Sequence, residues 1–293
     1  MKRFWLIAAI VILAASCVSQ PTPSEQDTVD AESAATESMQ VRKERIEEIR
    51  TPVVVTETVR FADGVIDRVV SYAYDDGYAR LLSSTAKKPS SADPIERVAY
   101  EYSDGVLASK SSFGPDGMLS TRSEYAYGTG GELVRETIYD GKGLIQSTSE
   151  WIWDNGRKSA WRVLSASGLA LARTEYFYEG DSIASARLFD GAGNSKGRIE
   201  YVYGEGGALV AVRYYDATGA EDGRIEYGQK DGRVVQESVY RADGRLERRL
   251  SYEYASDGAL VRKTLADSSG KTRETIVYDN AYRTETRTVV YYE

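Results

Sequence analysis

The residue types that most often carry catalysis are scarce in this sequence. It contains no histidine, which is the commonest general base and metal ligand in proteins, and only one cysteine, Cys17. Triads that need a histidine are therefore excluded, and no intrachain disulfide can form. We expect no metal site and no cofactor.

Acidic residues are further candidates for catalysis. Three pairs could model the acid and base of a glycoside hydrolase: Asp75/Asp76, Glu221/Asp222 and Asp116/Asp140. Each lies beside a glycine or in an expected turn, where aspartate is common because its side chain accepts hydrogen bonds from nearby backbone amides. We therefore interpret these carboxylates as turn residues, and we expect that the chain has no catalytic residues and is not an enzyme.

Tryptophan offers a binding chemistry instead. Trp151, Trp153 and Trp161 fall close together, and aromatic rings on a sheet can stack on sugars or peptides. We single them out as candidate ligand-binding residues. The alternative is that Trp151 and Trp153 are the bulkiest copy of a repeated aromatic doublet and belong to the core.

Cys17 stands at the end of an apolar N-terminal segment. Residues 1–3 carry positive charge, and residues 4–15 form an apolar run that is too short to span a bilayer as a helix. This combination is typical of a signal peptide. The sequence Leu13-Ala14-Ala15-Ser16-Cys17 resembles the lipobox of bacterial lipoproteins, in the relaxed form of spirochaete examples. The alternative is an ordinary cleaved signal with an incidental cysteine.

The lipobox resemblance implies how the chain is held. Residues 1–16 would be removed as a signal peptide, and Cys17 would be acylated, for example with palmitate. Two or more acyl chains make membrane attachment stable. We expect a lipid anchor in the cell envelope, at the outer membrane, with the periplasmic and surface sides both open.

Residues 17–50 separate this anchor from the rest of the chain. Residues 18–36 are rich in Ser, Thr, Pro, Glu and Asp and have few large apolar groups, which is typical of a flexible tether. Residues 37–50 carry Met39, Ile46 and Ile49 among charges. This pattern fits a short amphipathic helix and a charged continuation of the tether equally well.

Residues 53–293 form a repeat. Aromatic-x-aromatic doublets recur about every 25 residues, with Tyr227 alone in one slot: Tyr72/Tyr74, Tyr100/Tyr102, Tyr125/Tyr127, Trp151/Trp153, Tyr176/Tyr178, Tyr201/Tyr203 and Tyr252/Tyr254. Glycine-containing turn motifs lie between them, so each repeat has room for two strands and two tight turns. We predict an all-β antiparallel meander in a curled or partly closed sheet, with the tyrosines inward. The alternative is an extended single-layer sheet.

The two faces of this sheet differ, because side chains alternate along a strand. Tyr125 and Tyr127 share one face, and the Arg and Glu of a recurring Arg-x-Glu-Tyr pattern, such as Arg198 and Glu200, share the other. We expect one aromatic face and one charged face, with opposite charges on neighbouring strands stabilising each other. The charged face disfavours an outer-membrane barrel.

The motif between the doublets carries a family resemblance. An aromatic residue followed by Asp, with Gly three residues after the Asp, occurs at Tyr139, Phe189 and Tyr215, and Gly-Arg-Leu or Gly-Ala-Leu begins later strands at Gly244 and Gly258. Over residues 60–290 this pattern resembles the YD repeats of Rhs-type bacterial surface and toxin-delivery proteins. The resemblance implies long antiparallel strands that curl into a shell, although those shells use many more repeats.

The net charge of −8 argues against nucleic acid as a partner, because phosphates attract basic surfaces. We therefore predict a lipid-anchored repeat protein of the cell envelope that acts as a non-catalytic scaffold or as a binding or adhesion module. Its expected partners are the membrane, through acylated Cys17, and an envelope protein or glycan. The alternatives are a glycan-binding module that uses exposed aromatics and a hydrolase.

Overall fold

The computed structural model describes residues 42–292, of which residues 45–289 form one compact antiparallel β unit. The strands are β1 (Arg42–Phe61), β2 (Ile66–Tyr74), β3 (Leu81–Lys87), β4 (Pro94–Ser103), β5 (Val106–Phe113), β6 (Leu119–Tyr127), β7 (Leu133–Asp140), β8 (Ile145–Asp154), β9 (Arg157–Ser165), β10 (Ala170–Glu179), β11 (Ser182–Asp190), β12 (Ser195–Tyr203), β13 (Leu209–Tyr215), β14 (Glu221–Lys230), β15 (Arg233–Arg241), β16 (Leu246–Tyr254), β17 (Leu260–Asp267) and β18 (Thr272–Tyr292). One 3₁₀ turn, η1 (Glu205–Gly207), links β12 to β13.

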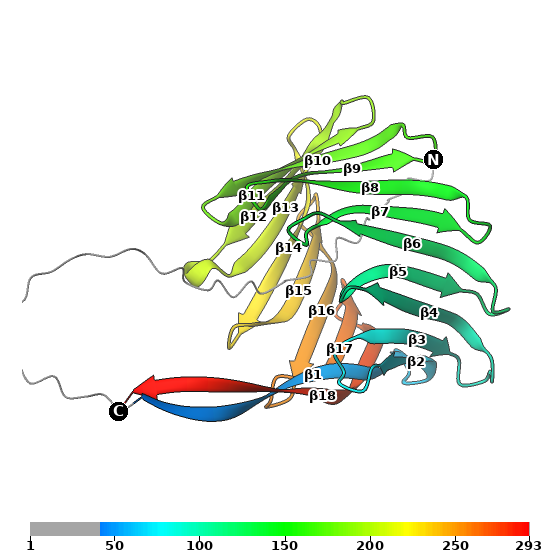
Figure 1. Cartoon of the computed structure of the whole chain (residues 1–293). Helices are drawn as coiled ribbons and strands as arrows, with labels where there is room; N and C mark the ends of the chain where they lie inside the picture. The colour runs from blue at the N-terminus through cyan, green and yellow to red at the C-terminus, as the bar shows by residue number, and fades with distance from the viewer. Residues whose placement is uncertain (1–41, 293) are drawn as a thin grey trace, which may run out of the picture. The chain divides into compact units, whose positions relative to one another are not determined.

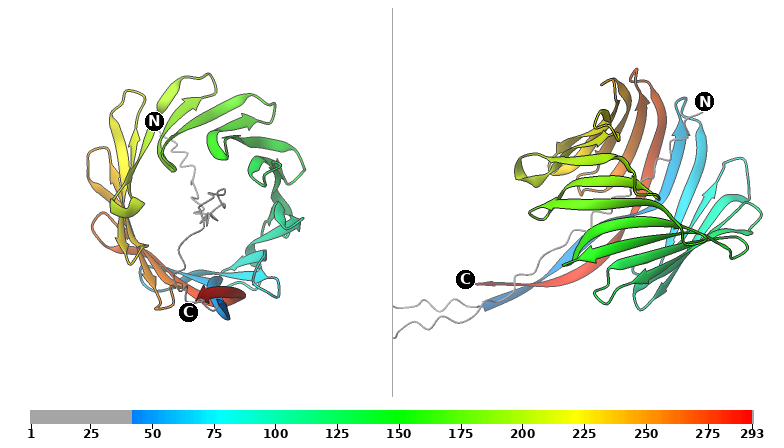
Figure 2. Two further views of the ribbon diagram at one scale, coloured as in Figure 1. Left: turned by 60° about the vertical axis from the view of Figure 1, so that its left-hand side comes forward. Right: turned by 90° about the horizontal axis from the view of Figure 1, so that it is seen from above.

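The predicted antiparallel meander is confirmed, and the sheet closes on itself. Each strand from β1 to β17 pairs with the next strand in the chain. Strand β1 also pairs with β18, which joins the two ends of the 18-stranded sheet. The strands therefore surround a central space (Figures 1 and 2), and the extended single-layer alternative is wrong.

Strand β1 corrects the expectation for residues 42–50. They are neither a helix nor a tether but the first half of a 20-residue strand. The partner is β18, which is also unusually long at 21 residues, and the Arg287 guanidinium lies 3.9 Å from the Glu47 carboxylate. The rest of the anchor and tether, including Cys17, lies outside the described residues.

The turns explain the aspartate of the repeated motif. In the β7–β8 turn the Asp140 carboxylate accepts hydrogen bonds from the amides of Lys142 (2.8 Å) and Leu144 (2.9 Å). Gly143 follows with a φ of 80°, a left-handed conformation that glycine adopts without strain. Asp190, Asp216 and Asp267 repeat this arrangement at later turns.

The strand register places the first residue of every doublet on one surface, which we call the tyrosine face. Its central row consists of Tyr72, Tyr100, Tyr125, Trp151, Tyr176, Tyr201, Tyr227, Tyr252 and Tyr278. Tyr278 is a copy that the doublet pattern missed, because its second position holds Asn280. The buried side chains of Ala186, Ile199 and Val212 pack with several of these rings and form an apolar cluster on β11–β13.

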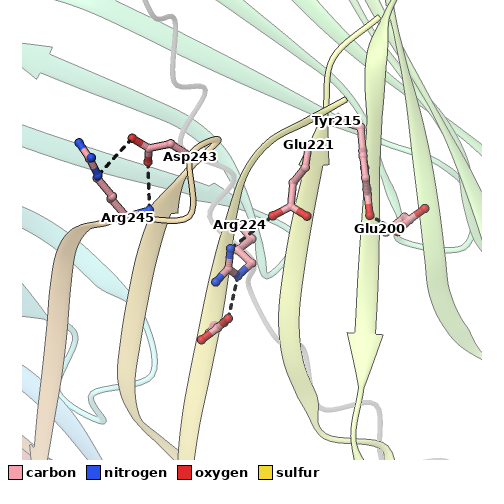
Figure 3. A network of polar contacts seen from close by, with 7 residues as sticks. Glu200, Tyr215, Glu221, Arg224, Asp243 and Arg245 are labelled. Atoms are coloured by element: carbon pink, nitrogen blue, oxygen red, sulfur yellow. Dashed lines mark hydrogen bonds and ion pairs between the residues drawn. The ribbon is translucent and has the colours of Figure 1, made fainter. Parts of the chain in front are cut away.

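The opposite surface, the charged face, points outward. Figure 3 shows this part of the wall with the strands of the opposite wall behind it, and Glu200, Tyr215 and Arg224 lie on the near side. The tyrosine face therefore lines the inside of the closed sheet. Barrels with this number of strands leave an aqueous interior, which agrees with the half-buried state of the tyrosine row.

Candidate functional site

The structure brings the three predicted tryptophans together on the tyrosine face. Trp151 and Trp161 are direct partners across β8 and β9, and Trp153 lies opposite Lys158. The indole N–H of Trp153 donates a 2.9 Å hydrogen bond to the backbone oxygen of Leu133. This bond gives Trp153 a structural role, whereas all three rings remain partly exposed to the interior.

The Trp153 bond belongs to a repeated set at one rim of the sheet. In every repeat, the side chain at the second doublet position donates a hydrogen bond to a backbone oxygen of the preceding strand. This oxygen belongs to the first or second residue of an odd-numbered strand or, for Tyr74, to a residue within β1. The bonds are Tyr74–Val54, Tyr102–Leu81, Tyr127–Leu107, Trp153–Leu133, Tyr178–Lys158, Tyr203–Ile183, Gln229–Leu209, Tyr254–Val234 and Asn280–Leu260. Backbone pairing between neighbouring hairpins ends before this rim. The side chains therefore donate hydrogen bonds to backbone carbonyls that have no backbone donor on the neighbouring strand.

The central tyrosines are protonated at neutral pH, as tyrosine ordinarily is, and burial raises their pKa further. This burial raises the pKa of Tyr125, Tyr227 and Tyr278 to about 12, and the neighbouring glutamates add to the shift. Tyr252 donates a 2.7 Å hydrogen bond to the Glu237 carboxylate. At neutral pH this surface therefore offers aromatic rings together with hydroxyl donors.

Charged side chains alternate with these rings on the tyrosine face. Glu136 lies opposite Tyr125, and Lys110 lies opposite Tyr100. The Lys158 amine lies 5.8 Å from the ring centres of both Trp153 and Tyr176, and burial lowers the pKa of this amine. The interior is therefore amphipathic rather than purely apolar.

Four of the six candidate acidic residues are engaged in local contacts. Asp75 accepts hydrogen bonds from two turn amides and Asp116 from one, Asp140 caps its own turn, and Glu221 lies 3.5 Å from Arg224. These contacts agree with a structural role for these four carboxylates. Within residues 42–292, no group of three or more acidic residues is arranged to hold a metal ion.

The charged face contains a second set of aromatic rings that the sequence analysis did not place there. Phe113, Phe189, Tyr215 and Tyr240 each lie beneath an arginine from the Arg-x-Glu-Tyr pattern or its equivalent. The Arg198 guanidinium lies 3.9 Å from the centre of the Tyr215 ring. Because arginine stacks well on aromatic faces, each pair covers apolar surface with a charged group.

Ion pairs on the charged face run along single strands and, as expected, also between neighbouring strands. Arg198 lies 3.0 Å from Glu200 along β12, and Arg162 of β9 lies 2.6 Å from Glu150 of β8. The Tyr215 hydroxyl also donates to Glu200 at 2.8 Å (Figure 3). The hydrogen bonds from Tyr215 and Arg198 lower the pKa of Glu200.

Two cavities open beside the strands. One, of about 420 Å³, is lined by residues of β2–β4 that include Arg68, Tyr72 and Glu96. The other, of about 380 Å³, lies next to the β8–β9 turn and is lined by Asp154, Asn155, Arg157, Ser159, Tyr176 and Tyr178. The second cavity lies at the hairpin that carries Trp151, Trp153 and Trp161, but these residues are not among those that line it. The prediction that they bind a ligand stays a prediction.

Among the described residues, none forms a helix with the length and apolar character needed to cross a bilayer. The lipidation prediction for Cys17 stays a prediction, because this residue lies outside residues 42–292.

No protein-family model matches the sequence, and no curated protein sequence matches it. Among solved structures, a porin-like protein from Bacteroides uniformis is similar with a TM-score of 0.43 and 10% identity, over 78% of this chain and 98% of that chain. A porin-like protein from Bacteroides vulgatus has a TM-score of 0.35 and 12% identity, over 77% and 97%.

A putative outer membrane lipoprotein-sorting protein domain from Vibrio parahaemolyticus has a TM-score of 0.23 and 7% identity, over 79% of this chain and 85% of that chain. At these TM-scores and identities, the likenesses assign neither a family nor a function to this chain.

Proposed function

We propose that this protein is a non-catalytic binding module of the cell envelope, held to a membrane through acylated Cys17. The tyrosine face is the surface that receives its ligand. The observation that carries the proposal is the continuous row of half-buried aromatic rings inside the closed sheet. Every repeat adds a ring to this row, and the surrounding strands separate it from the outer surface of the protein.

The chemistry of the tyrosine face supports a binding role. Its rings supply broad contact area and its protonated hydroxyls supply donors, while Lys110, Glu136 and Lys158 add charge at separate places. A surface that combines rigid aromatics with a few polar groups is typical of ligand recognition. Three of the candidate acidic residues, Asp75, Asp116 and Glu221, are bonded to turn amides or to an arginine, which favours binding over hydrolysis.

The charged face supports the proposal that a lipid attaches the protein to the membrane and that the β-sheet itself does not enter the bilayer. A wall that faces lipid presents an apolar band, whereas charged residues such as Arg198, Glu200 and Arg224 lie outward at the middle of strands. We therefore place the wall in water and assign membrane attachment to the acyl chains on Cys17.

The anchor is tested by metabolic labelling of cells with an alkyne analogue of palmitate. The wild-type chain should incorporate the label and sediment with membranes, whereas Cys17→Ala should lose the label and the membrane association. Labelling of the Cys17→Ala chain at the wild-type level would exclude the anchor.

The binding surface is tested by photo-crosslinking in intact cells. A benzophenone side chain is introduced at Tyr125 or Tyr227 on the tyrosine face, and at Ala126 or Glu226 on the charged face as a matched control. We expect a specific adduct from the inner positions and not from their outward neighbours. Adducts from the outer positions alone would show that the tyrosine face is not the binding surface.

A further inference from the structure

Three arginines at the rim make equivalent contacts between neighbouring hairpins. Arg80, Arg157 and Arg233 place their guanidinium carbons 5.7, 5.6 and 5.7 Å from the ring centres of Tyr102, Tyr178 and Tyr254. Each of these tyrosines is a rim donor described above. The three sites are therefore copies of one structural unit, which can be compared side by side.

Each arginine also reaches the turn of the next hairpin. Arg157 donates a 2.7 Å hydrogen bond to the backbone oxygen of Gly180 and forms an ion pair with Asp181. The Arg233 guanidinium lies so close to Gly258 that a Cβ there would be 2.3 Å from its nitrogen. These contacts fix the position of each guanidinium and connect adjacent turns.

The polar lining differs between the copies. Beside Arg157 the chain places Asp154, Asn155 and Ser159, and these three side chains line the cavity of about 380 Å³. At the positions that correspond to Asp154 and Ser159, the Arg233 copy has Lys230 and Val235. The arginine contact is thus shared by the copies, whereas Asp154 and Ser159 are particular to the Arg157 copy. The position of Asn155 is polar in the Arg233 copy as well, where it holds Asp231.

The lining matches the chemistry of a sugar. Tyr176 and Tyr178 provide aromatic surface against which the apolar side of a pyranose ring can lie. Asp154 accepts hydrogen bonds from hydroxyls, and Asn155 both donates and accepts them. Ser159 accepts them, because its own hydroxyl donates to the backbone oxygen of Ile152 at 3.1 Å. The volume lies within the range of small-ligand sites, and the net charge of −8 favours a neutral sugar over an anionic one.

We propose that the cavity between the β8–β9 turn and β10 binds the terminal pyranose of a neutral glycan. Asp154 and Asn155 hold the sugar hydroxyls, and Tyr176 supports the ring. This inference rests on the proposed function, because it names the ligand class of the binding module and one place where the ligand is held.

The tryptophans provide a reporter for the experiment. Trp151, Trp153 and Trp161 all lie on β8 and β9, and the remaining tryptophan, Trp5, falls in the expected signal peptide. Intrinsic fluorescence of the full-length protein in detergent should therefore report on this hairpin. The protein is titrated with cellohexaose, maltohexaose and chitohexaose.

We expect a saturable fluorescence change with at least one of these oligosaccharides. Asp154→Ala and Tyr176→Ala should weaken the apparent affinity at least tenfold. Asn155→Gly should also weaken it, and this change suits the backbone because Asn155 has a φ of 49°. The matched control is Lys230→Ala in the Arg233 copy, which changes the position that corresponds to Asp154 and should keep the wild-type affinity.

The inference is overturned if no oligosaccharide gives a saturable change, or if the Asp154 and Asn155 variants bind as the wild type does. In that event, adducts from the inner crosslinking positions would leave the proposed function standing. Conversely, a fluorescence response that depends on Asp154, together with adducts only from outer positions, would retain the sugar site and overturn the assignment of the tyrosine face.

Discussion

Tyr127 shows what one side chain contributes at the rim of the sheet. Its hydroxyl donates a 2.9 Å hydrogen bond to the backbone oxygen of Leu107, beyond the point where the β5–β6 ladder ends at Ser109 and Glu124. The doublet pattern in the sequence identified Tyr127 as a repeated residue. It did not reveal this bond, because the acceptor belongs to the backbone of another strand.

Replacing Tyr127 by phenylalanine tests the importance of the rim bonds. The Tyr127→Phe change keeps the ring but leaves the half-buried Leu107 carbonyl without its donor, which should cost about 1–2 kcal/mol of unfolding free energy. Urea denaturation, monitored by tryptophan fluorescence, measures this loss of unfolding free energy. The control Tyr291→Phe, in an exposed ring of β18, should change stability by less than about 0.5 kcal/mol.

Asp267 links the turn chemistry to pH. Hydrogen bonds from the Ser269 hydroxyl and from the amides of Ser269 and Lys271, together with Arg273, lower the pKa of its carboxyl group to about 2. Because the folded pKa lies below the unfolded value, the charged form stabilises the fold at pH values above about 4. This stabilisation is lost as the pH falls from about 4 to about 2.

The pH dependence can be measured with Asp267→Asn. The variant should be less stable than the wild type at pH 6, and the difference should shrink as the pH is lowered through this window. Chemical denaturation at a series of pH values gives the comparison. A stability difference that stays constant from pH 6 to pH 2 would contradict the assigned role of the charge.

At the scale of the elements, the turn motifs predicted where strands end, and the period of two predicted which residues share a face. The expectation of a helix or tether over residues 42–50 was wrong. The spacing of Ile46 and Ile49 suits a helix, but these residues have β18 as a pairing partner, and tertiary pairing outweighs a thin local pattern.

Gly191 shows how closely the turns pack against neighbouring strands. A Cβ at this position would lie 1.9 Å from the backbone oxygen of Ala170, so Gly191→Ala must displace one of the two segments. We expect a loss of more than about 2 kcal/mol of unfolding free energy. Gly77→Ala is the matched control, because open space surrounds Gly77, and it should be close to neutral. Equal stability of the two variants would contradict this packing.

At the scale of the whole β unit, closure depends on β1 and β18. Deletion of residues 272–293 removes β18 and leaves unpaired edges on β1 and β17, which are templates for association between molecules. We expect aggregation in size-exclusion chromatography and loss of a single cooperative unfolding transition. Deletion of residues 290–293 alone should leave both unchanged. A monomeric, cooperatively folded 272–293 deletion would show that closure is dispensable.

The sequence by itself determined the all-β class, the positions of most strands, the turn chemistry and the two faces. These properties depend on residues close together in the chain, such as Asp140 with Gly143 or Tyr125 with Tyr127. Only the tertiary structure decided that β1 meets β18, that rings such as Tyr215 lie beneath arginines outside, and that Asp154 and Tyr176 line one cavity. Each of these depends on how separate strands meet and diverge in space, and the free energy of that arrangement is set by contacts between distant residues that no local pattern records.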